Sequence, residues 1–102
     1  MEQIYFAKVR AEAIIPSRRT EDAGFDLYAC FAEDTLYFAP GETRVIPTGI
    51  ASAFDAGFYF QVKERGSTGV LGMAVRAGVI DSGYRGEWFI PITNLSAQPL
   101  YL

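Results

Sequence analysis

Turn residues divide this chain so regularly that they constrain its fold more than any other feature. Short apolar and aromatic runs recur about every 8–12 residues, with glycine, proline or aspartate between them. No segment shows sustained helical periodicity. The expected strands are residues 4–9, 35–38, 43–46, 50–54, 58–62 and 88–93. This pattern predicts an all-β sandwich or barrel.

Length and composition predict one globular domain that spans residues 1–102. Half of the residues are hydrophobic, yet no apolar run approaches the roughly 20 residues that a membrane-spanning helix needs. The first residues do not resemble a signal peptide, because no basic region precedes a long apolar core. Cys30 is the single cysteine, so an internal disulfide is excluded. Together these features favour a cytoplasmic protein.

The chain contains no histidine, which excludes catalytic triads based on histidine and histidine metal ligands. A general base must then be Asp, Glu, Lys or Tyr. If a metal takes part, a hard, oxygen-seeking ion such as Mg²⁺ is expected. The net charge of −3 provides no basic surface for nucleic acid. An anionic ligand would have to meet local arginines and a cation.

The stretch at residues 78–87 is typical of a β-hairpin with Ser82-Gly83 near its tip. Asp81 ends an apolar strand just before the turn, and Tyr84 follows the turn. An acid and an aromatic ring in these positions could face one small ligand from two sides. An ordinary hairpin in which Asp81 only forms the turn explains the same residues equally well.

Two other stretches allow both a structural and a functional interpretation. Residues 23–29 form a strand-like run in which Asp26 lies either on the solvated face or opposite a metal or an arginine. Residues 63–69 are either a polar connection or an anion site, because glycines let backbone N–H groups approach an anion beside Arg65 and the hydroxyls. Residue spacing alone favours the structural interpretation of each stretch.

Taken together, residues 23–27, 65–69 and 78–86 resemble, in this order, the first three motifs of the trimeric dUTPase family. Residues 45–50 resemble the strand that this family has between its first two motifs, so the resemblance covers nearly the whole chain. One departure concerns the second motif, in which a serine commonly follows the arginine directly. Here Gly66 occupies that position and Ser67 follows it.

The resemblance implies a jelly-roll-like β-barrel and a homotrimer with active sites at the subunit interfaces. It implies hydrolysis of dUTP to dUMP and pyrophosphate with Mg²⁺. Phosphoryl transfer suits such a site, because it requires positioning and charge stabilisation more than covalent chemistry.

By position, the resemblance assigns the activation of the attacking water to Asp81. The ring of Tyr84 would pack on the deoxyribose and leave no room for a 2′-hydroxyl. Asp26 would support the water shell of the metal or an active-site arginine. The other expected substrate-binding residues are Gly78, Val79 and Ile80 for the uracil edge, and Arg65, Gly66, Ser67 and Thr68 for the phosphates.

The family also has a fourth motif and a fifth, glycine-rich motif that forms a mobile arm, and both would follow Leu102. We therefore expect the 102-residue form to lack the C-terminal strands and the arm, and to turn over little dUTP. Two other functions stay open from the sequence. One is a dCTP deaminase-like enzyme, which shares the barrel, and the other is a non-catalytic trimeric protein that binds nucleotides or regulates a partner.

Overall fold

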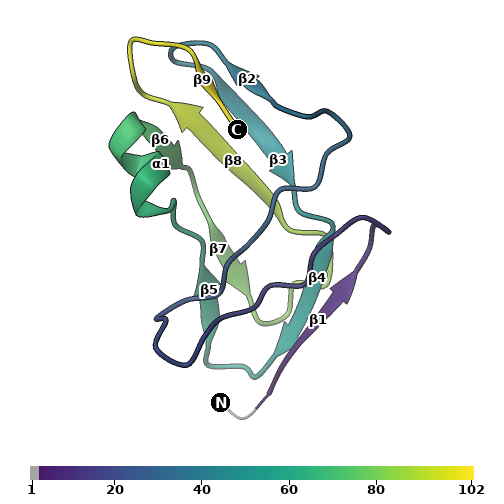
Figure 1. The fold of residues 1–102 in the computed structure, drawn as a ribbon. Coiled ribbons are helices and arrows are strands. Elements are labelled where there is room, and N and C mark those ends of the chain that lie inside the picture. Colours follow the sequence, from purple (N-terminus) through teal and green to yellow (C-terminus); the bar gives the residue numbers. More distant parts are fainter. Residues whose placement is uncertain (1–2) are drawn as a thin grey trace.

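The computed structural model describes residues 3–102, in which most of the regular structure is strand (Figure 1). This confirms the all-β prediction. The strands are β1 (Ile4–Lys8), β2 (Tyr37–Phe38), β3 (Thr43–Pro47), β4 (Ile50–Phe54), β5 (Tyr59–Gln61), β6 (Met73–Val75), β7 (Val79–Asp81), β8 (Phe89–Asn94) and β9 (Leu100–Tyr101). A short helix, α1 (Gly66–Leu71), precedes β6.

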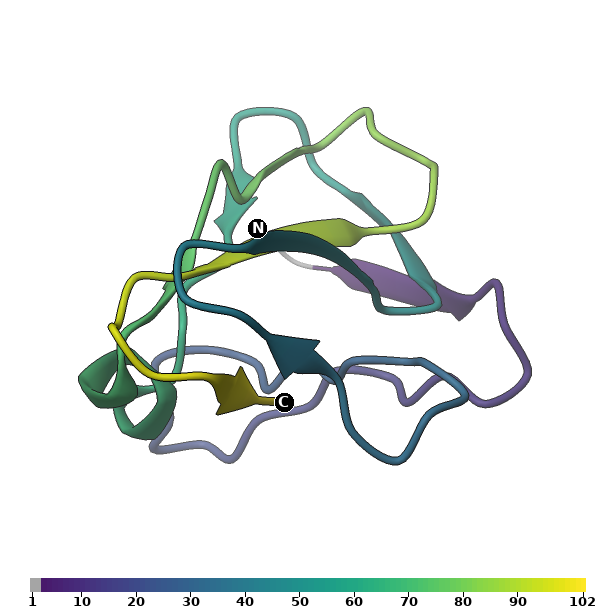
Figure 2. The ribbon, with the colours of Figure 1, turned by 90° about the horizontal axis from the view of Figure 1, so that it is seen from above.

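The strands pair in antiparallel groups that join distant parts of the chain. β8 lies between β3 and β6, so that Ile92 is opposite Arg44 on one side and Val75 on the other. β1 pairs with β4, β5 with β7, and β2 with β9. Seen from above in Figure 2, β2, β9 and the long connection between β1 and β2 run on one side of the β3–β8 pair. The loops that join β4 to β5 and β7 to β8 run on its opposite side.

Aromatic side chains form the centre of the larger core cluster. The ring of Phe60 packs against Phe6, Phe54 and Trp88, with ring centroids 5.8, 5.0 and 5.3 Å away. Trp88 is almost fully buried, and its indole N–H donates to the Ser52 hydroxyl at 3.0 Å. Buried aromatic rings remove much apolar surface from water, so they contribute strongly to folding. A second buried cluster contains Leu36, Phe38, Ile46 and Met73.

The hairpin predicted at residues 78–87 is wrong in its strand pairing, although the turn is present. The N–H of Tyr84 donates to the carbonyl of Asp81 at 3.1 Å, which closes the turn. The strand before this turn, β7, pairs with β5, whereas the strand after it, β8, pairs with β3 and β6. Residues 82–88 separate the two strands, which is more than a tight hairpin loop contains. The chain therefore crosses here from one sheet to another.

Other segments also differ from the strand pattern that the sequence indicates, and β6 and β9 are strands outside the expected set. Residues 23–29 form no strand; Asp26 makes only an isolated bridge with Ser17, while the Phe25 ring packs edge-on against Phe6 at 5.6 Å. Part of the predicted polar connection at residues 63–69 is helical, because α1 begins at Gly66. Gly72 ends this helix in the left-handed region with φ of 108°, which glycine adopts readily.

Within residues 3–102, no helix has the length and apolar character that crossing a membrane requires. The cytoplasmic location expected from the cysteine content stays a prediction.

Asn94 should be a large contributor to stability, because it is fully buried and its amide joins three segments. Its Nδ2 donates to the carbonyls of Phe38 (3.1 Å) and Gln98 (2.8 Å). Its Oδ1 accepts from the N–H and the hydroxyl of Ser96. Asn94→Asp keeps the shape but turns a carboxylate oxygen toward two carbonyl oxygens. We expect the free energy of unfolding to fall by about 2–4 kcal/mol.

Urea unfolding followed by tryptophan fluorescence measures this loss. Gln98→Ala is the matched control, because the side chain is exposed and the bond to Asn94 uses the backbone carbonyl. A loss for Asn94→Asp no larger than that of the control would contradict the assigned network.

Candidate active site

The residues predicted to form the site lie in two groups on this chain, and the groups line different cavities. Asp81 and Tyr84 line a small cavity of about 200 Å³ together with Val79, Ile80 and Phe89. Asp26, Arg65 and Thr68 line a larger cavity of about 860 Å³. A single chain therefore brings Asp81 together with Tyr84, and Asp26 together with Arg65, but does not bring all four residues into one cavity.

The turn after β7 presents the first group. Asp81 is the last residue of β7, opposite Tyr59 of β5, and its side chain is exposed. The hydroxyl of Tyr84 donates to the carbonyl of Glu87 at 2.6 Å, which fixes the direction of the ring. A Cβ at Gly86 would lie only 2.8 Å from that hydroxyl. The glycine at position 86 thus leaves room for this hydroxyl, and Tyr84 remains 42% exposed.

The strand that leads to this turn is fixed by Gly78. This residue has φ of +92°, and a Cβ there would lie 2.9 Å from the carbonyl oxygen of Val62. The N–H of Val62 donates to the carbonyl of Gly78 at 2.8 Å. Because bonding direction alternates along an antiparallel ladder, the N–H and C=O of Val79 point away from β5. These two backbone groups are available to a ligand on the free edge of β7.

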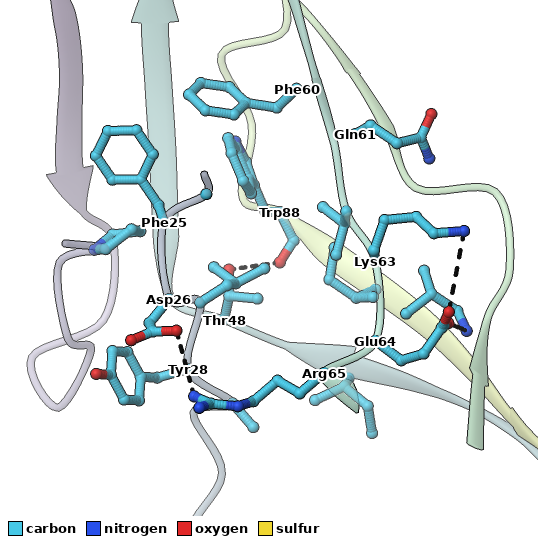
Figure 3. Close-up of a pocket in the computed structure, with 18 of the residues that line it drawn as sticks. Phe25, Asp26, Tyr28, Thr48, Phe60, Gln61, Lys63, Glu64, Arg65 and Trp88 are labelled. Carbon is cyan, nitrogen blue, oxygen red and sulfur yellow. Dashed lines mark hydrogen bonds and ion pairs between the residues drawn. The ribbon is translucent and has the colours of Figure 1, made fainter. Parts of the chain in front are cut away.

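The second group is held by an ion pair. Nη1 of Arg65 lies 3.2 Å from Oδ1 of Asp26, and Figure 3 shows the two side chains facing each other from different segments. The hydroxyl of Thr68 donates to the carbonyl of Arg65 at 3.0 Å, so it is engaged within the turn. Ser67 is exposed. Among the hydroxyls of this segment, that of Ser67 is the better placed to meet a ligand.

Glu64 and Glu87 are two carboxylates near these groups that the sequence interpretation missed. Oε2 of Glu64 accepts the N–H of Val75 at 2.8 Å. This bond, with a further bond from its own backbone, holds the pKa of Glu64 below its usual value. Glu87 accepts a bond from the backbone N–H of Gly49 at 2.9 Å. The position of Glu87, directly after the second turn glycine of residues 78–87, was a signal that could have identified it.

The described residues offer little direct coordination for a metal ion. Across residues 3–102, no three carboxylate or cysteine side chains gather closely enough to hold one. Asp26 presents one carboxylate oxygen to Arg65. Asp26 alone would leave most coordination positions of a Mg²⁺ ion to water and to other ligands.

A family model described as dUTPase matches residues 10–102. The chain belongs to the dUTPase family. The sequence resemblance is thereby confirmed. A relative named deoxyuridine 5'-triphosphate nucleotidohydrolase, from Leptospira interrogans, is 34% identical over 97 residues, which cover 91% of this chain and 66% of that protein.

Solved dUTPase structures share the fold, which confirms the jelly-roll-like β architecture. Native EIAV dUTPase superposes with a TM-score of 0.85 and 26% identity, over 98% of this chain and 78% of that chain. A mutant dUTPase from phage phi11 of S. aureus, which coordinates a structural Mg(II) ion, has a TM-score of 0.82 and 26% identity. This match covers 94% of the present chain and 62% of the phage chain.

The chain spans 66% of the length of the Leptospira relative and 53% of the length of a relative from Wolbachia pipientis. What those longer proteins act on and assemble with is therefore a proposal for this chain.

The bond from Val75 to Glu64 predicts a pH dependence of stability. Because the folded pKa of Glu64 is lowered from about 4.5, the ionised group stabilises the folded state above that pH. The contribution is lost as the pH falls through the lowered folded pKa. Glu64→Gln should therefore reduce the free energy of unfolding at about pH 6, and this difference from the original chain should shrink at lower pH.

Denaturant unfolding between about pH 6 and pH 3 measures both chains. Glu33→Gln, at an exposed position on the connection between β1 and β2, is the matched control. A difference for Glu64→Gln that is constant across this range would contradict the linkage.

Proposed function

We propose that the protein hydrolyses dUTP to dUMP and pyrophosphate. The observation that carries this proposal is the turn after β7, where an exposed carboxylate and a fixed aromatic ring line one small cavity. The name of the Leptospira relative states hydrolysis of the same nucleotide. No observation favours the deaminase or the non-catalytic alternative.

In this proposal Asp81 is the general base. The carboxylate of Asp81 takes a proton from a water molecule, the water oxygen attacks phosphorus, and pyrophosphate leaves. Asp81 suits this role because it is exposed at the end of a strand whose position β5 and Gly78 fix. The chain has no histidine to serve instead. A carboxylate is an adequate base when the water is well positioned.

The nucleoside would occupy the cavity between β7 and Tyr84. The outward N–H and C=O of Val79 would pair with the uracil edge, beside Gly78 and Ile80. The ring of Tyr84 would pack on the sugar. Because the Tyr84 hydroxyl is bonded to the carbonyl of Glu87, the ring cannot turn aside easily, and a 2′-hydroxyl would meet it.

The triphosphate would bind to residues of the second group. Arg65 supplies charge and directional donors, which suit phosphate oxygens, and Asp26 orients its guanidinium. Ser67 would contribute its hydroxyl, with the backbone of Gly66 and Thr68 nearby. Mg²⁺ would neutralise phosphate charge, with Asp26 reaching it through water.

A complete site would combine residues of different copies in a homotrimer. The support for this arrangement is that the two groups line separate cavities in a single chain. Asp81 and Tyr84 of one subunit would then meet Arg65 and Ser67 of a neighbouring subunit.

Asp81→Asn tests the proposed base in the natural full-length protein. The amide keeps the shape but cannot accept the proton, so kcat should fall by about 10²–10⁴, while binding of dUTP largely survives. Pyrophosphate release measures turnover. Asp55→Asn is the matched control, since Asp55 is an exposed acid in the turn between β4 and β5. Near-normal turnover of Asp81→Asn would remove this residue from the role.

Mixing two inactive variants tests whether one site combines two copies. Asp81→Asn chains and Arg65→Ala chains, unfolded and refolded together in equal amounts, should recover about a quarter of the original activity. Random assembly gives this fraction, because each site then draws an intact Asp81 and an intact Arg65 from different chains. No recovery in mixed oligomers would show that one chain supplies both residues.

A further inference from the structure

Glu87 lies in the loop between β7 and β8, and its carboxylate bonds residues of two other segments. Only 13% of this side chain is exposed. Oε2 accepts the N–H of Gly49 at 2.9 Å and lies 2.9 Å from Nε of Arg10. Oε1 lies 3.1 Å from the same nitrogen. One carboxylate thus joins the segment after β1, the turn between β3 and β4, and the loop that carries Tyr84.

Gly49, whose N–H binds this carboxylate, is itself held firmly. Gly49 has φ of +72°, and a Cβ there would lie 2.7 Å from the Cβ of Ala13 and 3.3 Å from the sulfur of Cys30. The carbonyl of Gly49 accepts the N–H of Val9 at 2.7 Å. Neighbouring atoms therefore leave the Gly49 N–H little freedom, and it fixes the position of the carboxylate that it binds.

The same residue holds the ring of Tyr84 through its backbone. The Glu87 carbonyl accepts the Tyr84 hydroxyl at 2.6 Å, and a Cβ added at Gly86 would lie 2.8 Å from that hydroxyl. A continuous set of bonds thus runs from Arg10 and Gly49, through Glu87, to the ring. A shift of the residue 87 backbone would move the acceptor on which the ring depends.

We propose that Glu87 is a positioning residue for the nucleotide site, which sets the ring of Tyr84 for selection of the deoxyribose. This inference rests on the proposed dUTP hydrolysis and adds Glu87 and Arg10 to that site. Neither residue touches the substrate in this arrangement. The carboxylate acts by fixing residue 87, and its bonds to Arg10 and Gly49 supply the rigidity.

The carboxylate is not the only anchor of this loop in the fold. The next residue, Trp88, already binds the adjacent strands, because its N–H donates to Ile50 at 2.9 Å and its carbonyl accepts the hydroxyl of Thr48 at 2.7 Å. Loss of the Glu87 side chain should therefore lower the Tm without preventing folding, while residue 87 loses its side-chain bonds to Arg10 and Gly49. This separates positioning from a purely structural role.

The test compares Glu87→Ala with Glu42→Ala in the natural full-length protein. Glu42 is a matched control at the opposite end of β3, since its carboxylate also accepts a backbone N–H, that of Ala39, at 2.8 Å. The readouts are the ratio of kcat/KM for dUTP to kcat/KM for UTP, and the Tm. Tyr84→Ala gives the ratio expected when the ring is absent.

Glu87→Ala should lower the dUTP-to-UTP ratio about tenfold, toward that of Tyr84→Ala, mainly through a higher KM for dUTP. Glu42→Ala should lower the Tm by a similar amount to Glu87→Ala but leave the dUTP-to-UTP ratio unchanged. Glu87→Gln should recover part of the ratio, because the amide oxygen can still accept the Gly49 N–H. Arg10→Ala should lower the ratio less than Glu87→Ala.

Three outcomes would overturn the inference. The first is an unchanged dUTP-to-UTP ratio for Glu87→Ala in a protein that does hydrolyse dUTP. The second is a change of this ratio in Glu42→Ala as large as that in Glu87→Ala. The third applies if Glu87→Ala does not fold: an unchanged dUTP-to-UTP ratio in both Glu87→Gln and Arg10→Ala would then overturn the inference. If the unsubstituted protein hydrolyses no dUTP, the proposed function is refuted, and the inference that rests on it is refuted as well.

Discussion

The bonds between Trp88 and the turn at residues 48–50 are the contacts on which the rest of the structure depends. The Trp88 backbone bonds both Thr48 and Ile50, so it connects the two strands that this turn joins. Its ring packs against Phe6 and Phe60 in the aromatic cluster. A single residue thus links the main-chain network to the hydrophobic core. The loop from β7 to β8 carries the candidate site, and it ends at this fixed point.

This arrangement explains how an exposed loop can be rigid enough for chemistry. At its start, β7 is paired with β5 and Gly78 packs against the Val62 carbonyl. At its end, the N–H of Trp88 donates to the carbonyl of Ile50, and the carbonyl of Trp88 accepts the hydroxyl of Thr48. Between these points, the N–H of Tyr84 closes the turn on Asp81 and its hydroxyl reaches Glu87. The side chains that would meet a nucleotide are therefore exposed, while the backbone that carries them is held, as accurate positioning requires.

Local sequence was sufficient for some of these features and not for others. The position of Asp81 at a strand end could be predicted, because Val79 and Ile80 are β-branched and a Ser-Gly turn follows. The partner of that strand could not, since pairing with β5 depends on contacts between residues distant in sequence. Helix α1 has 6 residues, too few to show periodicity in a window of about 11–18 residues. The segment around Phe25 was interpreted as strand-like because its run is apolar, and in the structure Phe25 instead packs against Phe6 and Phe60.

Gly66 occupies a position at which the second motif of the family commonly has a serine. A Cβ at Gly66 would meet nothing within 4 Å in this chain, so packing within one subunit does not require glycine there. Gly49 and Gly78, in contrast, are each required by a close contact of their own chain. Packing within one subunit therefore gives no reason for a glycine at position 66. In the proposed site, a phosphate that approaches the backbone beside Arg65 and Ser67 would supply such a reason.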